Sequence, residues 1–188
     1  TGLSMESMTQ GDGWRFLVIG RRVERSFWLV DLLRSCLCEA RAGRVEDGVL
    51  EALLIANESL MTHRLRYRAN LSVGNVLELI VSEASNPRAL AFQLEQINAA
   101  LEKLPRQRGL RPISGEERAI LQASTQVRLV DRDALSAAES SGQRTALQTF
   151  LDQIRANLEA IDQGLSHSYF IHVQPARLLQ ALATRDEE

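Results

Sequence analysis

The chain has 188 residues, the size of one ordinary domain, and its 45% of apolar residues is enough to build a hydrophobic core. Charged residues make up 24% and the formal charge is −2, a balance that argues against nucleic-acid binding and against an acidic tail protein. No apolar run reaches the roughly 18 residues of a membrane span, and no charged start followed by an apolar stretch indicates a signal peptide. We therefore expect a cytoplasmic protein with neither a nucleic-acid partner nor a membrane partner.

The sequence offers little to a metal ion or a cofactor. Cys36 and Cys38 are the only cysteines, and two positions apart on a helix they point to different sides and cannot pair within it. A reducing compartment is the simplest interpretation. Neither cysteine has a histidine at zinc-ligand spacing, and the Glu-x-x-His pattern of di-iron bundles is absent. The sequence predicts no metal site and no cofactor.

The helical period recurs along the first half of the chain, and no apolar–polar alternation is long enough for a strand. Asp12 is a plausible N-cap for a long helix to about residue 40. Its apolar stripe has steps of three and four: Phe16, Ile19, Val23, Phe27, Val30, Leu33 and Leu37. Shorter helices are predicted at 44–61, continuing or bending through 62–68, and at 73–84.

In the second half, Asn86-Pro87 predicts an N-cap with a first-turn proline, for a helix that ends before Pro105. A loop over 105–113 leads to a capping box of Ser114 and Glu117, which opens a helix to about residue 138. A break at 140–142 precedes the last long stripe, and a short helix is predicted after Pro175. That stripe consists of Leu147, Phe150, Ile154, Leu158, Ile161 and Leu165. The fold class is all-α: one domain over 1–188, a bundle of about six or seven helices.

A charged cluster interrupts the second face of the first long helix. On a helical wheel, Arg21, Glu24 and Arg25 share a side with four apolar residues, opposite the main stripe. The apolar residues of that face are Trp14, Leu17, Trp28 and Leu32. The wheel points Arg22 elsewhere, so Arg22 is the member of this run that we would drop first from a site.

Three interpretations of this cluster stay open. It is a buried Arg–Glu network that fixes helix packing, a solvated face, or an electropositive pocket for an anionic or peptide ligand. Arg64 and Tyr67 share a helix face further on, and Arg64 either pairs between helices or joins Arg21 and Arg25 in one pocket. Of the 22 basic residues all but one are arginine, which codon bias explains in most cases and recognition of carboxylate or phosphate in a few.

Four ordered stretches resemble the alpha-E domain, a helical bacterial family. They are Met5 to Phe16 with Ile19 to Arg25, Thr62-His63-Arg64-Leu65-Arg66-Tyr67, Asn86-Pro87-Arg88-Ala89-Leu90-Ala91-Phe92-Gln93-Leu94, and Tyr169-Phe170. His63 and Ala89 depart from the family's Tyr and Ser. Members begin with an earlier stretch carrying a related Gly-Arg…Glu-Arg motif, so the resemblance implies the C-terminal half of such a domain, a fragment or C-terminal part of a larger protein.

The resemblance implies an accessory domain of a bacterial system that makes or modifies peptides or amides together with an ATP-grasp ligase. Its ligand-binding residues would be Arg21, Arg22, Glu24, Arg25, Arg64, Tyr67, Arg88 and Gln93. Glu24 is the candidate acid–base residue, and Gln93 beside an apolar stripe is equally typical of a buried amide with its hydrogen bonds satisfied. The second class of function is a non-catalytic module that docks onto the ligase or forms a homo-oligomer, with these residues as structural pairs.

Overall fold

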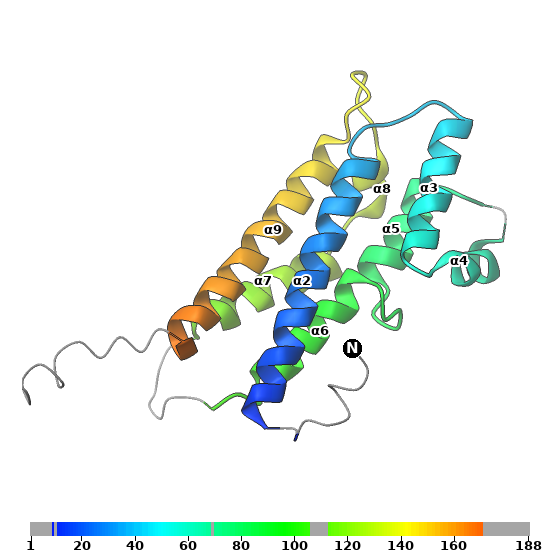
Figure 1. Ribbon diagram of the computed structural model, residues 1–188. Coiled ribbons are helices and arrows are strands. Elements are labelled where there is room, and N and C mark those ends of the chain that lie inside the picture. Colours follow the sequence, from blue (N-terminus) through cyan, green and yellow to red (C-terminus); the bar gives the residue numbers. More distant parts are fainter. Residues whose placement is uncertain (1–8, 10, 69, 106–112, 171–188) are drawn as a thin grey trace, which may run out of the picture.

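The computed structural model describes residues 9, 11–68, 70–105 and 113–170 (Figure 1). This part of the chain is α-helical, and its β contacts amount to an isolated bridge between Glu39 and Gln143. The helices are α2 (Asp12–Leu37), α3 (Arg44–Ala56), α4 (Leu60–Tyr67), α5 (Val73–Leu77), α6 (Leu90–Leu101), α7 (Gly115–Arg128), α8 (Arg132–Ser136) and α9 (Thr145–Leu165). Two π-helical segments follow α5 and α9: η1 (Glu78–Ser82) and η2 (Ser166–Phe170). The predicted all-α bundle is confirmed.

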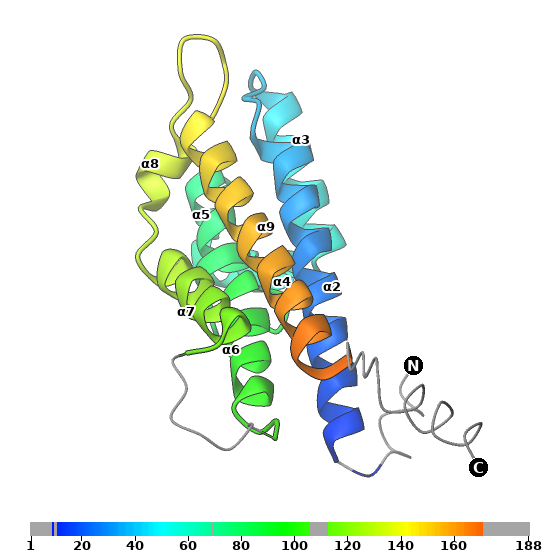
Figure 2. The ribbon, with the colours of Figure 1, turned by 90° about the vertical axis from the view of Figure 1, so that its left-hand side faces the viewer.

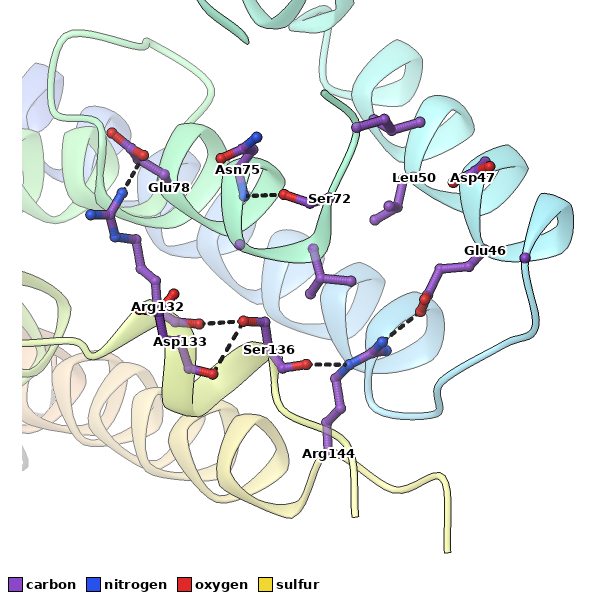
Figure 3. A pocket seen from close by; sticks show the side chains of 14 residues that line it. Glu46, Asp47, Leu50, Ser72, Asn75, Glu78, Arg132, Asp133, Ser136 and Arg144 are labelled. Atoms are coloured by element: carbon purple, nitrogen blue, oxygen red, sulfur yellow. Dashed lines mark hydrogen bonds and ion pairs between the residues drawn. The ribbon is translucent and has the colours of Figure 1, made fainter. Parts of the chain in front are cut away.

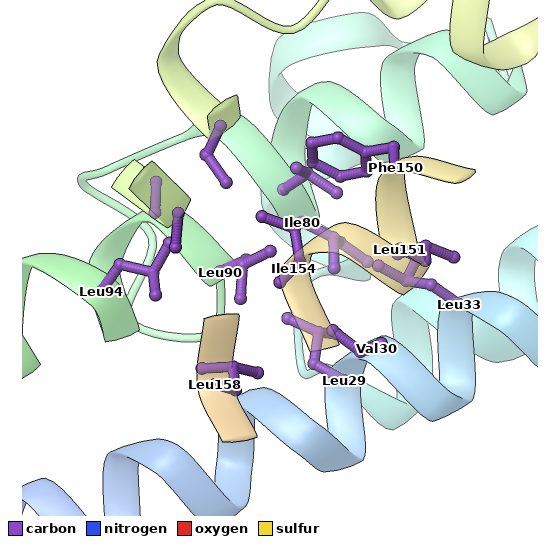
Figure 4. Packing of buried hydrophobic residues seen from close by; sticks show 14 of the residues in the cluster. Leu29, Val30, Leu33, Ile80, Leu90, Leu94, Phe150, Leu151, Ile154 and Leu158 are labelled. Carbon is purple, nitrogen blue, oxygen red and sulfur yellow. The ribbon is translucent and has the colours of Figure 1, made fainter. Parts of the chain in front are cut away.

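Four helices, α2, α6, α7 and α9, form the body of the bundle, and the shorter helices gather beside the end where α2 finishes and α9 starts (Figures 1 and 2). The core lies between them. Leu29, Val30 and Leu33 of α2 meet Leu151, Ile154 and Leu158 of α9, with Leu90 and Leu94 of α6 and Ile80 of η1 (Figure 4). The two stripes predicted from periodicity therefore face each other across the core.

Ion pairs at the surface show the direction in which α2 and α9 run relative to each other. Asp31 pairs with Arg155 and Arg34 pairs with Asp152, so residue numbers rise along one helix as they fall along the other. The two helices are antiparallel. Each of these half-exposed pairs contributes at most about 1 kcal/mol. The pairs favour one register of α9 along α2, while the buried leucines and isoleucines supply most of the stability.

The helix ends differ from the predictions where side chains bond to the backbone. The capping box of Ser114 and Glu117 is confirmed, with bonds of 3.3 and 3.2 Å. The single helix predicted to residue 138 is wrong: α7 ends at Arg128, and Asp131 caps α8 by accepting from two backbone amides. The predicted helix at 44–61 is also divided, because α3 ends at Ala56 and α4 starts at Leu60.

Asn86 is not the N-cap that the Asn-Pro pair predicts. The helix begins later, at Leu90, with Ala89 as N-cap. The Asn86 Oδ1 atom accepts instead from the backbone amide of Arg88, at 3.0 Å, which makes a turn before the helix. The predicted helix after Pro175 lies outside the described residues, as does most of the loop before residue 113. None of the helices in the described ranges is long and apolar enough to cross a membrane.

Candidate functional site

An open pocket of about 720 Å³ lies along the middle of α2. Helix α2 supplies most of its lining, and the end of α3 and the turns before α4 and α6 supply the rest. Its lining consists of Val18, Arg21, Arg22, Glu24, Arg25, Trp28, Ala56, Glu58 and Arg88. The volume is in the range of small-molecule sites in proteins. The lining has four arginines against two glutamates, a formal charge of +2.

Arg22 is anchored at the edge of this pocket by helix α6. Its Nη1 atom donates to the Oε1 atom of Gln93 at 2.9 Å, and its guanidinium carbon lies 5.3 Å from the centroid of the Phe92 ring. Both contacts orient the guanidinium, but neither carries a negative charge. Burial lowers the pKa of Arg22, and the positive charge of Arg25 lowers it further. The site therefore holds a fixed cation that is partly desolvated.

Gln93 is the buried support of this cation. Its side chain is fully buried, and its Nε2 atom donates to the carbonyl oxygen of Pro87 at 2.7 Å. Because the amide nitrogen is committed to that carbonyl, the amide oxygen is turned toward Arg22. The interpretation of Gln93 as a satisfied buried amide is confirmed, and its partner is a lining residue of the pocket.

Glu24 and Arg25 lie in the pocket without making a closed salt-bridge network. Within the described part of the chain, neither side chain has a hydrogen bond or an ion pair. Glu24 is exposed and Arg25 is half-buried. Two arginines one turn apart, Arg22 and Arg25, thus face one pocket with no carboxylate paired to either among those residues. A positively charged pocket of this kind attracts carboxylate or phosphate.

The structure does not bring Arg64 and Tyr67 to this pocket. Arg64 is exposed on α4 and pairs with Glu51 of α3 at 2.8 Å. Tyr67 is half-buried beside His63, with 5.0 Å between the ring centroids, and its pKa is raised chiefly by burial. The two residues support the packing of α4, so the idea that Arg64 joins Arg21 and Arg25 is wrong.

Arg22, the residue that the wheel removed from the cluster, lines the pocket after all. A wheel places side chains around one helix, but the neighbouring helix decides which of them reach a shared cavity. Here α6 approaches the Arg22 side of α2. Trp28 lines the pocket with 45% of its surface exposed, whereas Trp14, Leu17 and Leu32 from the same face of the wheel do not.

A second pocket, of about 640 Å³, lies between α3, α5 and α8 (Figure 3). Both of its arginines are already paired, Arg132 with Glu78 and Arg144 with Glu46. Arg144 is only 4% exposed, and it also donates to the carbonyl oxygens of Leu37 and Ser136. These contacts join helix ends, so we assign this pocket a structural role. No group of three metal-ligating side chains occurs among the described residues.

The profile of the Alpha-E family, described as a predicted alpha-helical domain with a conserved ER motif, matches residues 1–170. The chain belongs to the alpha-E family. It contains two Glu-Arg pairs. Glu24-Arg25 lies in the 720 Å³ pocket along α2, called the arginine pocket below, and Glu117-Arg118 lies in the first turn of α7.

The alpha-E domain is also similar to longer mycobacterial proteins. It is 35% identical over 166 residues to uncharacterized proteins of Mycobacterium bovis and Mycobacterium tuberculosis. The match covers 88% of this chain but 18% of each relative, so the chain spans less than a fifth of their length. No solved structure matches it.

Sequence reasoning missed one charged residue of the arginine pocket, Glu58. This residue follows α3 and pairs with Arg88, thirty positions away in the chain. No local pattern places it, because the contact depends on how two turns meet. The sequence signal nearest to it was the Asn86-Pro87-Arg88 stretch, because Arg88 is the ion-pair partner of Glu58.

We expect the alpha-E domain to lose stability as the pH falls below about 6.5, because of His63. This side chain is buried on α4, and burial lowers its pKa below the ordinary histidine value. A lowered folded pKa means that the unfolded chain binds the proton more strongly. Stability is therefore complete above the unfolded pKa and decreases as the pH falls toward the folded one, by up to about 1.4 kcal/mol per pH unit. Urea unfolding between pH 5 and 7.5 measures this slope.

His63→Phe is the matched variant for this test. It keeps a flat ring beside Tyr67 and removes the titrating group, so the slope between pH 5 and 6.5 should flatten. The carboxyl of Glu83, whose pKa is lowered from 4.5 to about 2 chiefly by its hydrogen bond from Arg66, loses its contribution to stability mainly between these two values, below that window. Equal slopes in the wild type and in His63→Phe would show that His63 is not the group responsible.

Proposed function

We propose that this domain binds an anionic ligand, a carboxylate- or phosphate-bearing peptide or small molecule, in the arginine pocket of α2. The observation that carries this proposal is the pair of guanidiniums of Arg22 and Arg25. They face one pocket without a paired carboxylate among the described residues, and burial together with their mutual repulsion disfavours the charge on Arg22. An arriving anion relieves that repulsion, which makes binding favourable.

The shape of arginine and the rest of the lining support the ligand class. A guanidinium presents a planar fork of donors that matches carboxylate and phosphate oxygens, and Phe92 and Gln93 hold that of Arg22 in place. Val18, Ala56 and Trp28 add apolar surface to the same pocket. A ligand with an acidic group attached to an apolar or flat portion satisfies both parts of the lining.

The biological setting that we propose is an accessory role in a bacterial system that forms or modifies peptide or amide bonds with an ATP-grasp ligase. The resemblance to the alpha-E family supports this setting. Glu24 is the one carboxylate on the α2 side of the pocket, and it is exposed. If the system uses this domain in catalysis, Glu24 is the residue that we propose as its acid–base group.

Titration with phosphate, ATP and a short acidic peptide tests the binding proposal, with calorimetry or a thermal-shift assay as the measurement. We expect at least one of these to bind, and Arg25→Gln to weaken it about tenfold, the loss of one charge-assisted contact. Arg64→Gln is the control, because Arg64 pairs with Glu51 away from the pocket. It removes the same charge and should leave the affinity unchanged.

Equal weakening by Arg25→Gln and Arg64→Gln would mean that the net charge of the domain, and not the pocket, attracts the anion. Absence of binding by all three compounds would favour the alternative of a non-catalytic module that docks onto the ligase or forms a homo-oligomer. Its support is the set of large apolar side chains exposed on α3 and α4: Val45, Ile55, Met61 and Leu65. Sedimentation of the domain alone and with a ligase would then measure association directly.

A further inference from the structure

One side of the arginine pocket is closed by an ion pair between Glu58 and Arg88. The Glu58 side chain is 70% exposed and that of Arg88 is 32% exposed. Arg88 therefore differs from Arg22 and Arg25, since its charge already has a carboxylate partner. Exposed ion pairs of this kind are weak and exchange readily with other anions.

The backbone holds Glu58 at this place in an uncommon conformation. Its φ angle is 51°, in the left-handed region that residues with a side chain rarely adopt. That conformation costs about 1 kcal/mol and persists where neighbouring contacts fix it. The contacts here are buried: Asn57 donates to the Leu53 carbonyl at 2.9 Å, and the Ser59 hydroxyl donates to the Asn57 carbonyl at 2.9 Å.

A single amide, that of Asn86, joins the turn of Glu58 to the turn of Arg88. Its Nδ2 atom donates to the Ser59 hydroxyl at 3.2 Å and to the Leu79 carbonyl at 2.9 Å. Its Oδ1 atom accepts from the backbone amide of Arg88 at 3.0 Å. The residue next to Glu58 and the backbone of Arg88 are thus tied to the same side chain. The Glu58 carboxylate and the Arg88 guanidinium meet because Asn86 holds the two turns together, so the backbone positions of both residues are fixed.

We propose that the pocket takes a ligand with two acidic groups, one bound by Arg22 and Arg25 and the other replacing the Glu58 carboxylate at Arg88. Glu58 is then a built-in counter-ion that determines specificity. It neutralises Arg88 when the pocket is empty, and a ligand with one acidic group leaves it in place. A ligand with a second acidic group gains the Arg88 contact, at the cost of breaking a weak exposed pair. This inference rests on the anion-binding function proposed above.

The test compares acids with one and two acidic groups against the same variants of the full chain. Glutarate is titrated against butyrate, and pyrophosphate against phosphate, so that carboxylate and phosphate chemistry are distinguished. Chemical shifts of the arginine side chains report binding. We expect Glu58→Gln to raise the affinity for glutarate or pyrophosphate about fivefold, the equivalent of one exposed ion pair. The affinity for butyrate or phosphate should change by less than about twofold. Arg88→Gln should abolish the preference for two acidic groups.

Glu51→Gln is the matched control, because Glu51 makes an exposed ion pair with Arg64 outside the pocket. It should leave both affinities and their ratio unchanged. A preference for two acidic groups that survives Arg88→Gln, or a ratio that does not respond to Glu58→Gln, overturns this inference while leaving anion binding intact. If the wild type binds none of the four compounds, the anion-binding function fails, and this inference fails with it.

Discussion

Replacing Arg144 by methionine is expected to lower the free energy of unfolding by about 3 kcal/mol. Methionine keeps most of the volume of the side chain, so the loss comes from polar contacts and not from a cavity. For a domain of this length the melting temperature should fall by roughly 10 °C. Urea unfolding followed by circular dichroism, with the wild type measured in parallel, gives the difference directly.

The reason is that one guanidinium satisfies groups at the ends of three helices. It donates to the carbonyl oxygen of Leu37 at 2.9 Å and to that of Ser136 at 3.0 Å, and these residues end α2 and α8. Its third contact is Glu46 at 2.6 Å, in the first turn of α3. Terminal helix carbonyls have no partner within their own helix, so removing Arg144 leaves the buried Leu37 carbonyl and the part-buried Ser136 carbonyl without this donor. Figure 3 shows the contacts of Arg144 with Ser136 and Glu46.

Arg155→Met is the control for this prediction. Arg155 also bridges two helices, since it pairs with Asp31 of α2 and with Glu159 of its own helix, but its side chain is 42% exposed. Water replaces its contacts when they are lost, and the expected cost is below about 1 kcal/mol. Similar losses in Arg144→Met and Arg155→Met would show that burial is not what makes Arg144 important.

The helices of the core could be predicted because their signal is local. The stripe from Leu147 to Leu165 is buried at every predicted position, and the buried side of α2 contains Ile19, Val23, Val30, Leu33 and Leu37 as expected. Apolar residues at helical spacing must face the same neighbour, whatever that neighbour is. The capping box of Ser114 was equally accessible, since both of its partners lie within four residues.

The helix breaks could not be predicted in the same way. Asn57 and Ser59 interrupt the predicted helix at 44–61 because their side chains bond to backbone carbonyls, an option that asparagine and serine have in any loop and many helices. Asn86 looked like a cap for the same reason. Its Oδ1 partner, the backbone amide of Arg88, is local, but its Nδ2 atom donates to Leu79 of η1 and to Ser59, which lies 27 positions away in the turn between α3 and α4. No local pattern predicts the contact with Ser59.

Helical periodicity predicts the centre of the candidate site. At its edges, Arg22 and Arg88 were expected from the family resemblance alone, and Glu58 was not expected. Arg21, Glu24, Arg25 and Trp28 share a face of one helix, so a wheel finds them. The positions of Arg22, Glu58 and Arg88 depend on α6 and on two turns that approach α2 from elsewhere. The residues that distinguish the pocket from an ordinary charged face are therefore those that tertiary contacts supply.

Gln93→Glu is expected to abolish most of the anion binding, with a loss of affinity of about tenfold or more. A carboxylate at this fully buried position would pair with Arg22, whose present acceptor is the neutral amide oxygen at 2.9 Å. This ion pair would neutralise the Arg22 guanidinium, the cation that we propose binds the anionic ligand. Stability should decrease by only about 1–2 kcal/mol, because the new ion pair compensates in part for the lost bond to the Pro87 carbonyl.

Gln93→Met separates charge from packing. It removes the same amide bonds, and with no compensating ion pair it should cost about 2 kcal/mol of stability, at least as much as Gln93→Glu. Arg22 nevertheless stays charged and faces the same pocket, so the affinity for the anion should stay within about threefold of the wild type. The less stable variant would then be the better binder. Equal loss of binding in both variants would instead assign Gln93 the role of holding the Arg22 side chain in position, with its lack of charge of no consequence.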